Sequence, residues 1–583
     1  MQLIFAIVMS FLAVRGFRYD LTGDGLVLRN TLRFDWLLLF LFLLVILYRS
    51  FREPDRRLKG FSALFAGITA VFYLLGVNLE KTETLSRIWE SSGYLLNQLN
   101  LLYAHMILYY CCTFTAFRFL AGRQGSGSRQ KKTVIDFRKV LLFWGILLLL
   151  YLPWYLSCYP AITSPDSDDQ IRQALGLKPL SNHHPVLLTL AIRLILSVTR
   201  LFSPSLQTGV GVCSFLQMIT VTFVFAAVYE RIRCHLENRL LRLIAFLWYA
   251  VYPVHMIFSV TLWKDILFSV CIPVLMLCLD AAEEDEAGFF SSGGKKALLF
   301  LSLALLPILR HNGIAVTLIL SIYMLFFFKT FRRQVLVICA GALITVGIWN
   351  MAVLPALNAR SVESDLILSL LQQQAVRVLS RHREELPEEE ISILQGYYNV
   401  PDIWMRYDPR IADSVKRHFM NDVFAEDPDG FFSVWKSWGL RYPADYFEAI
   451  LHNNYGYWFP EIIYPAASFG VWTKEPIEDL HYAPILKTGI IHRILDWFEN
   501  ARYEKTPLMP LLFSRGACWW VWLFCGIFCL YRAPRKFLLF LPGAVLWLSI
   551  LVSPLFCEYR YVYGLFTGLP LIMASALGSA REE

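Results

Sequence analysis

Long apolar runs alternate with short polar loops along most of the chain. Several of these runs reach the roughly 17–25 residues that an α-helix needs to cross the hydrocarbon core of a bilayer. The pattern predicts a mainly α, polytopic membrane protein with about 14 spans. The expected spans are residues 2–14, 35–48, 60–79, 94–117, 139–157, 210–229, 243–259, 266–279, 297–309, 312–328, 334–354, 517–531, 537–553 and 560–577.

Composition agrees with a membrane protein rather than a soluble one. Hydrophobic residues make up 56% of the 583 residues and charged residues only 17%, below the roughly 25% of a soluble domain. The net charge of +8 does not indicate a nucleic-acid partner, because Lys and Arg in membrane proteins mark the cytoplasmic loops. The 12 cysteines lie mostly in apolar runs and show no spacing typical of zinc ligands.

The basic loops indicate which side of the membrane each loop faces, since segments rich in Lys and Arg are expected in the cytoplasm. An acidic loop, residues 280–296, falls on the same side by the count of spans and still carries two lysines. We therefore expect a multi-pass protein of a bacterial plasma membrane. The segments expected in the cytoplasm are residues 49–59, 118–132, 230–242, 329–333 and 532–536.

An even number of crossings must separate two cytoplasmic loops, and this rule singles out residues 185–201. Three apolar segments lie between the loops at 118–132 and 230–242, so one of them does not span. In residues 185–201 polar side chains recur every three or four positions, which is typical of a helix lying in the membrane interface. We expect this helix on the outer surface; a tilted span with snorkelling arginines is the alternative. The polar positions are Thr189, Arg193, Ser197 and Arg200.

The same count places residues 355–516 outside the cell. From residue 355 to residue 515 the chain holds 16 Lys and Arg against 23 Asp and Glu, whereas the rest of it is basic. This shift predicts a water-facing, mostly α domain inserted before the last three spans. The expected domains are membrane helices at residues 1–120, a membrane core at 139–354 with an outer acidic loop at 158–184, the outer domain at 355–516, and C-terminal membrane helices at 517–583.

Unusual polar residues gather at the outer edge of the predicted membrane domain, although they are far apart in sequence. Charged groups near a bilayer edge are costly unless they are paired, so a set of them on one side suggests a site. A cap at a helix end is the simpler explanation for any one of them, but not for all of them together. The groups are Asp166, Asp168 and Asp169; His183 and His184; Lys264 and Asp265; Arg310, His311 and Asn312; and Glu558 and Arg560.

These residue types favour chemistry on a phosphate. A carboxylate of the cluster at 166–169 can act as a general base or hold a divalent metal. Lys264 can neutralise a phosphate, and the planar side chains of Arg310 and Arg560 can bind one through two parallel hydrogen bonds. A base and a phosphate clamp at the outer leaflet fit a lipid phosphate whose tail stays in the bilayer and whose head group reaches water.

Five short motifs, in their order along the chain, give the sequence a resemblance to the GT-C glycosyltransferases. An outer loop with Ser-Pro-Asp, a His-Pro pair and an interfacial helix follow one another within residues 139–354, and residues 517–577 match more loosely. The resemblance implies a multi-spanning enzyme of GT-C type that takes its sugar from a polyprenyl-phosphate donor. The motifs are YPAITSPDS (159–167), HHP (183–185), WKD (263–265), RHNG (310–313) and YRY (559–561).

The resemblance also implies roles for these residues. An acceptor hydroxyl would attack the anomeric carbon with inversion, while Asp166, which matches the family's loop aspartate, takes its proton. Cations would stabilise the leaving lipid phosphate, so no general acid is needed. Asp168 or Asp169 could serve as the base instead, and a divalent metal could bind Asp166, Asp169 and His184. The residues expected to bind the donor phosphate or the substrate are His183, His184, Lys264, Asp265, Arg310, Asn312, Glu558 and Arg560.

Two other functions fit parts of the pattern. A transporter or flippase of a lipid-linked saccharide would place charges near the bilayer midplane and repeat its hydropathy in two halves, and neither feature is evident. A phosphotransferase acting on lipid head groups would use a nucleophile or a metal cluster, which the two histidines near the acidic cluster keep open. The glycosyltransferase is the first hypothesis and the transporter its alternative.

Overall fold

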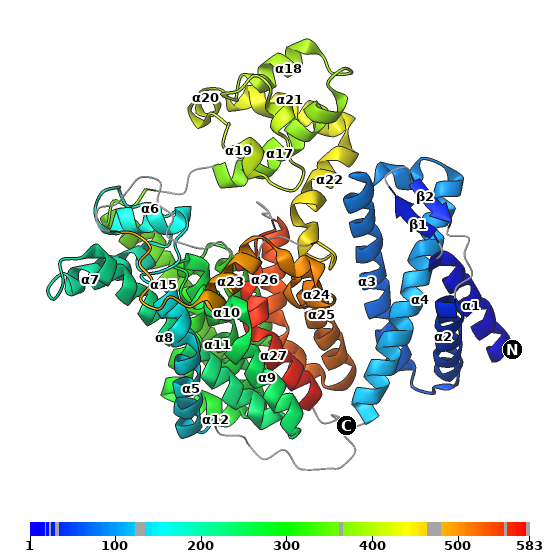
Figure 1. The fold of residues 1–583 in the computed structure, drawn as a ribbon, viewed down its shortest axis with the longest axis horizontal. Helices are drawn as coiled ribbons and strands as arrows, with labels where there is room; N and C mark the ends of the chain where they lie inside the picture. Colours follow the sequence, from blue (N-terminus) through cyan, green and yellow to red (C-terminus); the bar gives the residue numbers. More distant parts are fainter. Residues whose placement is uncertain are drawn as a thin grey trace.

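The computed structural model describes residues 1–17, 19–22, 25–28, 34–122, 135–360, 365–462, 480–552 and 557–578. In these residues the protein is mainly α-helical, as the apolar pattern predicted, with a short β-hairpin near the N-terminus. Figure 1 shows a group of N-terminal helices on one side, a central bundle, and a lobe above the bundle. Most of the basic loop at 118–132 lies outside the described residues.

The N-terminal group packs four helices against one another. α3 lies along α4, and α1 packs on α4 from the other side. Gly16 permits the close approach of α1, because a Cβ there would lie 2.4 Å from the Asn100 carbonyl oxygen of α4. The elements are α1 (Gln2–Phe17), β1 (Tyr19–Thr22), β2 (Gly25–Leu28), α2 (Phe34–Arg52), α3 (Arg56–Thr82), η1 (Ser86–Trp89) and α4 (Ser92–Gly122), with β1 and β2 antiparallel.

The central bundle takes its helices from two distant stretches of sequence. α11 packs on α27, and α25 packs on α27 in turn, so the C-terminal helices complete the bundle that α5 and α8 begin. The first stretch holds α5 (Phe137–Ser157), α6 (Pro165–Ala174), α7 (Val186–Thr199), α8 (Leu206–His235), α9 (Arg239–Val251), α10 (Pro253–Ser259), α11 (Lys264–Glu284), α12 (Glu286–Ser291), α13 (Gly293–Leu309), α14 (Gly313–Phe327), α15 (Arg332–Ile348), η2 (Trp349–Val353) and α16 (Leu354–Ala356). The second holds η4 (Tyr455–Tyr457), α23 (Gly489–Glu499), η5 (Arg502–Lys505), α24 (Met509–Phe513), α25 (Arg515–Arg532), η6 (Pro534–Leu539), α26 (Leu541–Val552), η7 (Tyr559–Val562) and α27 (Tyr563–Gly578).

Six helices in the described part of the chain are long and apolar enough to cross a membrane, and the bent pair α9 and α10 would make a seventh crossing. Shorter apolar helices include α7, which has 14 residues. At about 1.5 Å per residue α7 measures about 21 Å, less than the roughly 30 Å hydrocarbon core. The six long segments are Arg56–Thr82, Phe137–Ser157, Leu206–His235, Lys264–Glu284, Arg332–Ala356 and Tyr559–Gly578.

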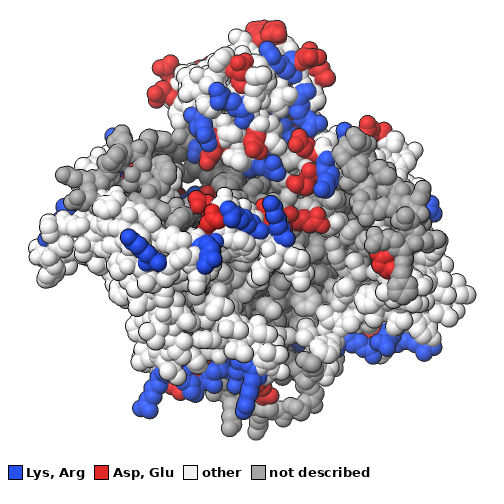
Figure 2. Space-filling model, in the orientation of Figure 1, with Lys and Arg blue, Asp and Glu red and all other residues white. Residues whose placement is uncertain are grey.

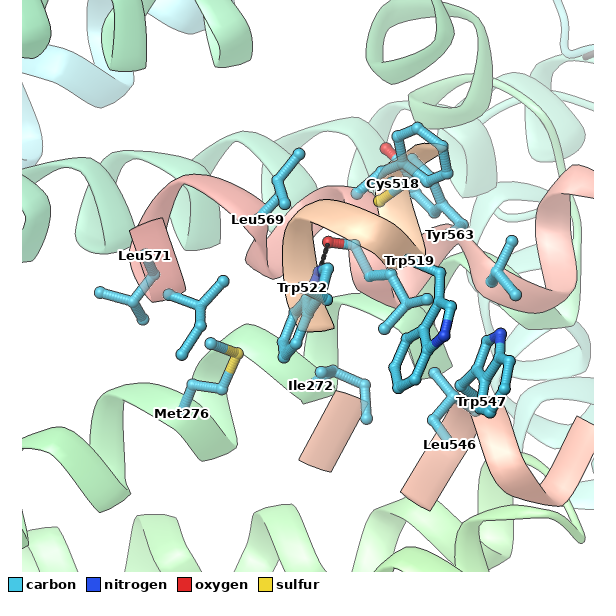
Figure 3. Close-up of a cluster of buried hydrophobic side chains, with 14 of the residues drawn as sticks. Ile272, Met276, Cys518, Trp519, Trp522, Leu546, Trp547, Tyr563, Leu569 and Leu571 are labelled. Atoms are coloured by element: carbon cyan, nitrogen blue, oxygen red, sulfur yellow. Dashed lines mark hydrogen bonds between the residues drawn. The ribbon is translucent and has the colours of Figure 1, made fainter. Parts of the chain in front are cut away.

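Tryptophan and tyrosine rings pack among aliphatic side chains in a buried cluster of the bundle, as Figure 3 shows. The rings of Trp519 and Trp547 stack with their centroids 3.9 Å apart, and the indole N–H of Trp522 donates to the Leu565 carbonyl at 2.9 Å. Gly543 lets α26 approach this cluster, because a Cβ there would lie 2.5 Å from the Trp522 ring. This packing fixes α25, α26 and α27 relative to one another and so positions η7, which precedes α27.

A lobe with its own hydrophobic core stands above one end of the bundle (Figure 1). Its buried side chains run from Leu368 to Tyr446. Trp438 is fully buried in this core and donates its indole N–H to Glu390 at 2.6 Å. The lobe consists of α17 (Asp365–His382), α18 (Glu388–Gln395), η3 (Ile403–Arg406), α19 (Asp413–Lys416), α20 (Asn421–Glu426), α21 (Pro428–Arg441) and α22 (Pro443–Asn454).

The segment after the lobe, from residue 455 onward, returns to the bundle. Tyr457, Trp458 and Leu495 are buried in the same core as the bundle helices. The indole N–H of Trp547 in α26 donates to the Tyr457 carbonyl at 3.0 Å. The region predicted as one outer domain, residues 355–516, therefore divides into a lobe and a segment packed on the bundle, because these aromatic side chains find apolar partners on the bundle helices.

The lobe is tied to the C-terminal end of α3. The Glu448 carboxylate accepts hydrogen bonds from the Thr84 hydroxyl at 2.8 Å and from the Leu85 N–H at 2.7 Å. The Arg377 guanidinium of α17 contacts Glu448 and donates to the Glu83 carbonyl at 3.1 Å. These bonds join the lobe to the N-terminal group, although more than 280 residues separate the partners in sequence.

Basic side chains line the end of the molecule opposite the lobe, along the lower edge of Figure 2. The acidic loop at 280–296 begins at this end. Asp280 is fully buried and contacts Arg231, His235 (2.6 Å) and Lys536 (3.1 Å). The acidic loop thus neutralises basic residues from two of the basic loops, which explains how an acidic segment can lie at the basic end of the molecule.

Candidate functional site

The helix α6 carries the acidic cluster of the loop at 158–184, and its first turn is strongly specified by sequence. Ser164 is the N-cap: its hydroxyl accepts from the Ser167 N–H at 3.4 Å, and the Ser167 hydroxyl accepts from the Ser164 N–H at 3.1 Å. This reciprocal pair is a capping box, and Pro165 occupies the first helical position that proline favours. Asp166 therefore sits in the first turn of α6, where the helix dipole favours a carboxylate.

The loop before α6 is paired with the loop that leads into α11. The Ile162 N–H donates to the Val260 carbonyl at 3.0 Å, and the Leu262 N–H donates to the Ile162 carbonyl at 3.0 Å. The Ser167 hydroxyl donates to the Leu262 carbonyl at 2.6 Å. These bonds place the start of α6 next to the start of α11, where Lys264 lies.

The helix α7 supports α6 from its other end. Arg193 of α7 donates to the Ala174 carbonyl at 3.1 Å and to the Gln173 carbonyl at 2.9 Å, both in the last turn of α6. A cation is favourable there because the last carbonyls of a helix lack partners and carry its negative end. The polar stripe predicted on residues 185–201 thus includes a residue that faces α6.

Three distant parts of the chain meet at Asp166. Its carboxylate lies 2.5 Å from the Arg560 guanidinium of η7 and 3.9 Å from the Lys264 ammonium of α11. All three side chains are between 13% and 23% exposed, so the contacts lie at a partly open surface of the bundle. The convergence expected of these residues from sequence is therefore present.

Two further carboxylates share the same cations. Asp265 is fully buried, contacts Arg310, and lies 3.6 Å from the Arg560 guanidinium. Glu558 contacts the Arg560 Nε. Lys264, Arg310 and Arg560 carry three positive charges, and Asp166, Asp265 and Glu558 carry three negative charges. The cluster is therefore balanced in charge when all of its groups are ionised.

Two aromatic rings complete the cluster, and neither was among the expected site residues. The Arg560 guanidinium lies 5.1 Å from the Trp263 ring centroid, and the Arg310 guanidinium lies 4.3 Å from that of Tyr561. Such contacts hold a guanidinium in place while leaving its N–H groups to bond. Trp263 belongs to the WKD motif and Tyr561 to the YRY motif. Both rings could have been identified from the sequence, because each directly neighbours a basic residue of the predicted site.

Of the two adjacent histidines, His184 faces the cluster. Its side chain is 2% exposed, its Nδ1 lies 3.2 Å from the Lys264 ammonium, and its Nε2 lies 3.8 Å from Asp169. His183 is exposed, and its backbone carbonyl accepts from Lys264 at 3.1 Å. Contact with His184, together with the charge of Lys178, lowers the pKa of Asp169 to about 2.

Two of the expected residues lie apart from the cluster. Asp168 is buried on another face of α6, where it accepts from Arg172 at 2.9 Å. Asn312 is the N-cap position of α14, and its side chain makes no hydrogen bond within the part of the chain described here. Its neighbour His311 lies 3.1 Å from the Asn182 carbonyl, which anchors the loop that carries the histidines.

The metal ligands suggested by sequence were Asp166, Asp169 and His184. Across the described ranges, no group of three or more His, Cys, Asp and Glu is placed to hold a metal ion. The physical reason is that each carboxylate forms an ion pair with a basic side chain: Asp166 contacts Arg560, and Asp169 contacts Lys178. The arrangement suits a phosphate-binding cluster better than a metal centre.

The cluster pushes the pKa values of two carboxyl groups in opposite directions. Burial opposes the ionisation of Asp166, but the charges of Arg560 and Lys264 outweigh it and hold its pKa well below the usual range. For Glu558 burial outweighs the attraction of Arg560 and raises the pKa. Such divergence is typical of sites where one group must stay ionised and another can take up a proton.

Comparisons with known proteins add a family. A model of a family of unknown function (DUF6020) matches residues 177–582, which is more than half of the chain. The match begins after α6, so it includes Lys264, Arg310 and Arg560 but not Asp166. Neither the curated proteins nor the solved structures contain a match to the chain.

Proposed function

For this chain, which belongs to the family of unknown function DUF6020, we propose the activity of a membrane glycosyltransferase. It transfers a sugar from a polyprenyl-phosphate donor to an acceptor outside the cell, with inversion at the anomeric carbon. The observation that carries the proposal is the contact of Asp166 with Arg560 and Lys264 at one end of an apolar bundle. A base beside two phosphate-binding cations, at the edge of a membrane domain, is what a lipid-phosphate donor requires.

The balanced charge of the cluster indicates how the donor would be handled. A phosphate must compete with the carboxylates, so its arrival draws Arg560 and Lys264 away from Asp166. Asp166 then loses the charges that hold its pKa low and becomes a stronger base. Binding of the donor thus activates the base.

The transfer itself follows from these positions. The acceptor oxygen attacks the anomeric carbon, and the bond from that carbon to the phosphate oxygen breaks. Its electron pair leaves with the lipid phosphate, where Arg560 and Lys264 stabilise the charge. Asp166 takes the proton of the acceptor hydroxyl.

We also propose the finer architecture that the resemblance implies. The bundle is of GT-C type, and its shorter apolar helices bring the number of spans to about 14. The cluster faces the outside of a bacterial plasma membrane, because the basic loops lie at the opposite end.

The test replaces the base and its neighbour separately. Asp166→Asn is expected to lower transfer about 10²–10⁴-fold, the range for loss of a general base. The measurement is mass spectrometry of envelope glycans in a strain that lacks the gene and carries each variant. Asp169→Asn is the matched control, since it removes a carboxylate of the same helix that contacts Lys178 and His184 instead.

The control on folding is the thermal midpoint of the purified variants, which should stay close to that of the native chain. If Asp166→Asn restores the glycan fully while Asp169→Asn does not, the base is Asp169. If loss of the gene changes no glycan, the glycosyltransferase proposal fails. If the Asp166→Asn variant still moves a lipid-linked saccharide across the membrane, the transporter is favoured instead.

A further inference from the structure

A second polar site lies in the N-terminal group, at the end that carries the basic loops. A pocket of about 650 Å³ between α2 and α4 is lined by Arg49 and Arg118 together with Ile46, Phe114 and Phe119. A pocket of about 500 Å³ adjoins it, shares Arg49 and Arg118, and adds Arg52 and Glu53. This double pocket belongs neither to the charged cluster at α6 nor to the residues that the family model matches.

The walls of the double pocket are held in place. Ser50 of α2, which is buried, and Tyr110 of α4 form a partly buried hydrogen bond between the two helices. The Tyr110 ring stacks on Phe114, with centroids 5.9 Å apart, and Phe114 is 2% exposed. Arg118 pairs with Glu53 across the rim at 3.3 Å. The pocket is therefore a built feature of the helix pair and not a gap between mobile side chains.

The charge of the double pocket is unbalanced. Three guanidinium groups line it, and Glu53 is the carboxylate among its lining residues. Glu53 is paired with Arg118, whereas the Arg52 guanidinium lies over the Tyr48 ring at 4.4 Å. Arg49 has neither a carboxylate nor an aromatic partner among the residues that the structure describes. Within the described part of the chain, the pocket thus presents two positive charges that no carboxylate of its lining neutralises.

Apolar surface continues from the pocket along the helices. Its inner wall holds Ile46 and Phe114, and the Phe119 side chain beside them is 53% exposed. On α2, Val45 and Phe42 extend the exposed apolar face for a further turn. A ligand with an anionic head and a hydrocarbon tail would match both surfaces at once.

We propose that this double pocket binds the headgroup of an anionic phospholipid of the inner leaflet. The phosphate takes hydrogen bonds from Arg49 and Arg52, and an acyl chain runs along the apolar face of α2 and α4. Basic pockets between membrane helices on the cytoplasmic side are suited to such headgroups. The site gives the N-terminal group a role of its own, which does not depend on the proposed transferase activity.

The test compares lipid retention by the full chain and by variants. Each protein is reconstituted in vesicles of equal parts phosphatidylglycerol and phosphatidylcholine, extracted, and examined by native mass spectrometry for bound lipid. The double variant Arg49→Gln, Arg52→Gln should lower the preference for phosphatidylglycerol about 30-fold, since each basic residue near an anionic surface contributes about fivefold. Neither arginine is in an ion pair with a residue that the structure describes, so folding should be preserved.

A matched control removes two exposed arginines from the same end of the molecule but outside the pocket: Arg239→Gln with Arg333→Gln. This variant should keep the native preference. Glu53→Gln should raise the preference about fivefold, because it removes the negative charge of the rim. The proposal is overturned if the control loses as much phosphatidylglycerol as the pocket variant, or if the pocket variant loses none. It is also overturned if inorganic phosphate displaces the lipid at equal concentration, since the site would then be one for free phosphate.

Discussion

At the scale of single residues, Arg560 organises the site. Its guanidinium touches Asp166, Asp265 and Glu558, and it lies over the Trp263 ring. A planar fork with five donors can serve several carboxylates at once, whereas a Lys ammonium is a single point of charge. The same geometry suits the exchange of a carboxylate for a phosphate, which is why Arg560 is central to the proposed mechanism.

Glu558 gives a prediction on pH. Burial raises its pKa, so the folded protein binds this proton more tightly than the unfolded chain does. Stability should therefore fall as pH rises from the unfolded value of about 4.3 through the raised folded value. In Glu558→Gln this loss is absent, so the thermal midpoint of the native chain should drop relative to the variant as pH rises above about 4.3.

The measurement is the thermal midpoint of both proteins across that range. Asp166 contributes with the opposite sign, since its pKa is lowered and its stabilisation is lost as pH falls. The pKa of Asp166 is lowered while that of Glu558 is raised, so the stabilisation by Asp166 is lost at lower pH than the change that Glu558 produces. A constant difference between native protein and variant would show that Glu558 ionises as freely in the folded state as in the unfolded chain.

At the scale of elements, α6 and α7 act as a unit. The capping box fixes the first turn of α6, and Arg193 of α7 binds its last carbonyls. The stripe of polar residues on α7 predicted an interfacial helix, and Arg193 of this stripe also has a structural partner in α6. The short helix α7 therefore supports the helix that carries Asp166.

This support can be tested with Arg193→Met, which keeps an apolar stem but removes both hydrogen bonds. A hydrogen bond to a charged group contributes about 1.5–3 kcal/mol, so we expect a loss of about 2 kcal/mol in the free energy of unfolding. Faster hydrogen exchange in residues 165–176 would locate the effect.

The matched control for α7 is Arg200→Met, because the Arg200 side chain is exposed at the end of the same helix. Its effect should stay within about 0.5 kcal/mol. If both variants lose the same free energy of unfolding, the positive charge of α7 stabilises the protein and the contact of Arg193 with α6 does not.

At the scale of the whole molecule, charge divides the protein into two ends. The lobe and the charged cluster at α6 lie toward one end, and the basic loops with the buried Asp280 cluster lie toward the other. The positive-inside tendency predicts that the basic end faces the cytoplasm. This orientation is required if the cluster is to meet an acceptor outside the cell.

Orientation is tested by labelling introduced cysteines in whole cells with a maleimide that does not cross membranes. Cysteine in place of Glu389, which is exposed on the lobe, should be labelled directly. Cysteine in place of Glu237, which is exposed at the basic end, should be labelled only after the cells are permeabilised. The reverse pattern would place the charged cluster in the cytoplasm and remove the basis for an outer acceptor.

Several properties of this protein follow from its sequence alone. Apolar run lengths predict helices and the membrane class, since burial of a run in lipid depends on its own composition. The uneven distribution of Lys and Arg along the chain predicts two ends, and the set Asp166, Lys264, Arg310 and Arg560 was identified from residue type and side. Each of these properties depends on the residues of a single segment, or on adding up the charge or hydrophobicity of such segments. None of them requires knowledge of how the helices pack.

Other properties were decided only by tertiary structure. The choice between His183 and His184 and the packing of residues 455–462 and 480–513 on the bundle depend on contacts between distant segments. Loop pairing between Ile162 and Leu262 sets which side chains meet. The spacing of residues in the sequence does not determine which way a side chain points when it contacts a distant segment. That orientation is fixed only by the packing of the elements and by the hydrogen-bond partners that the packing places within reach.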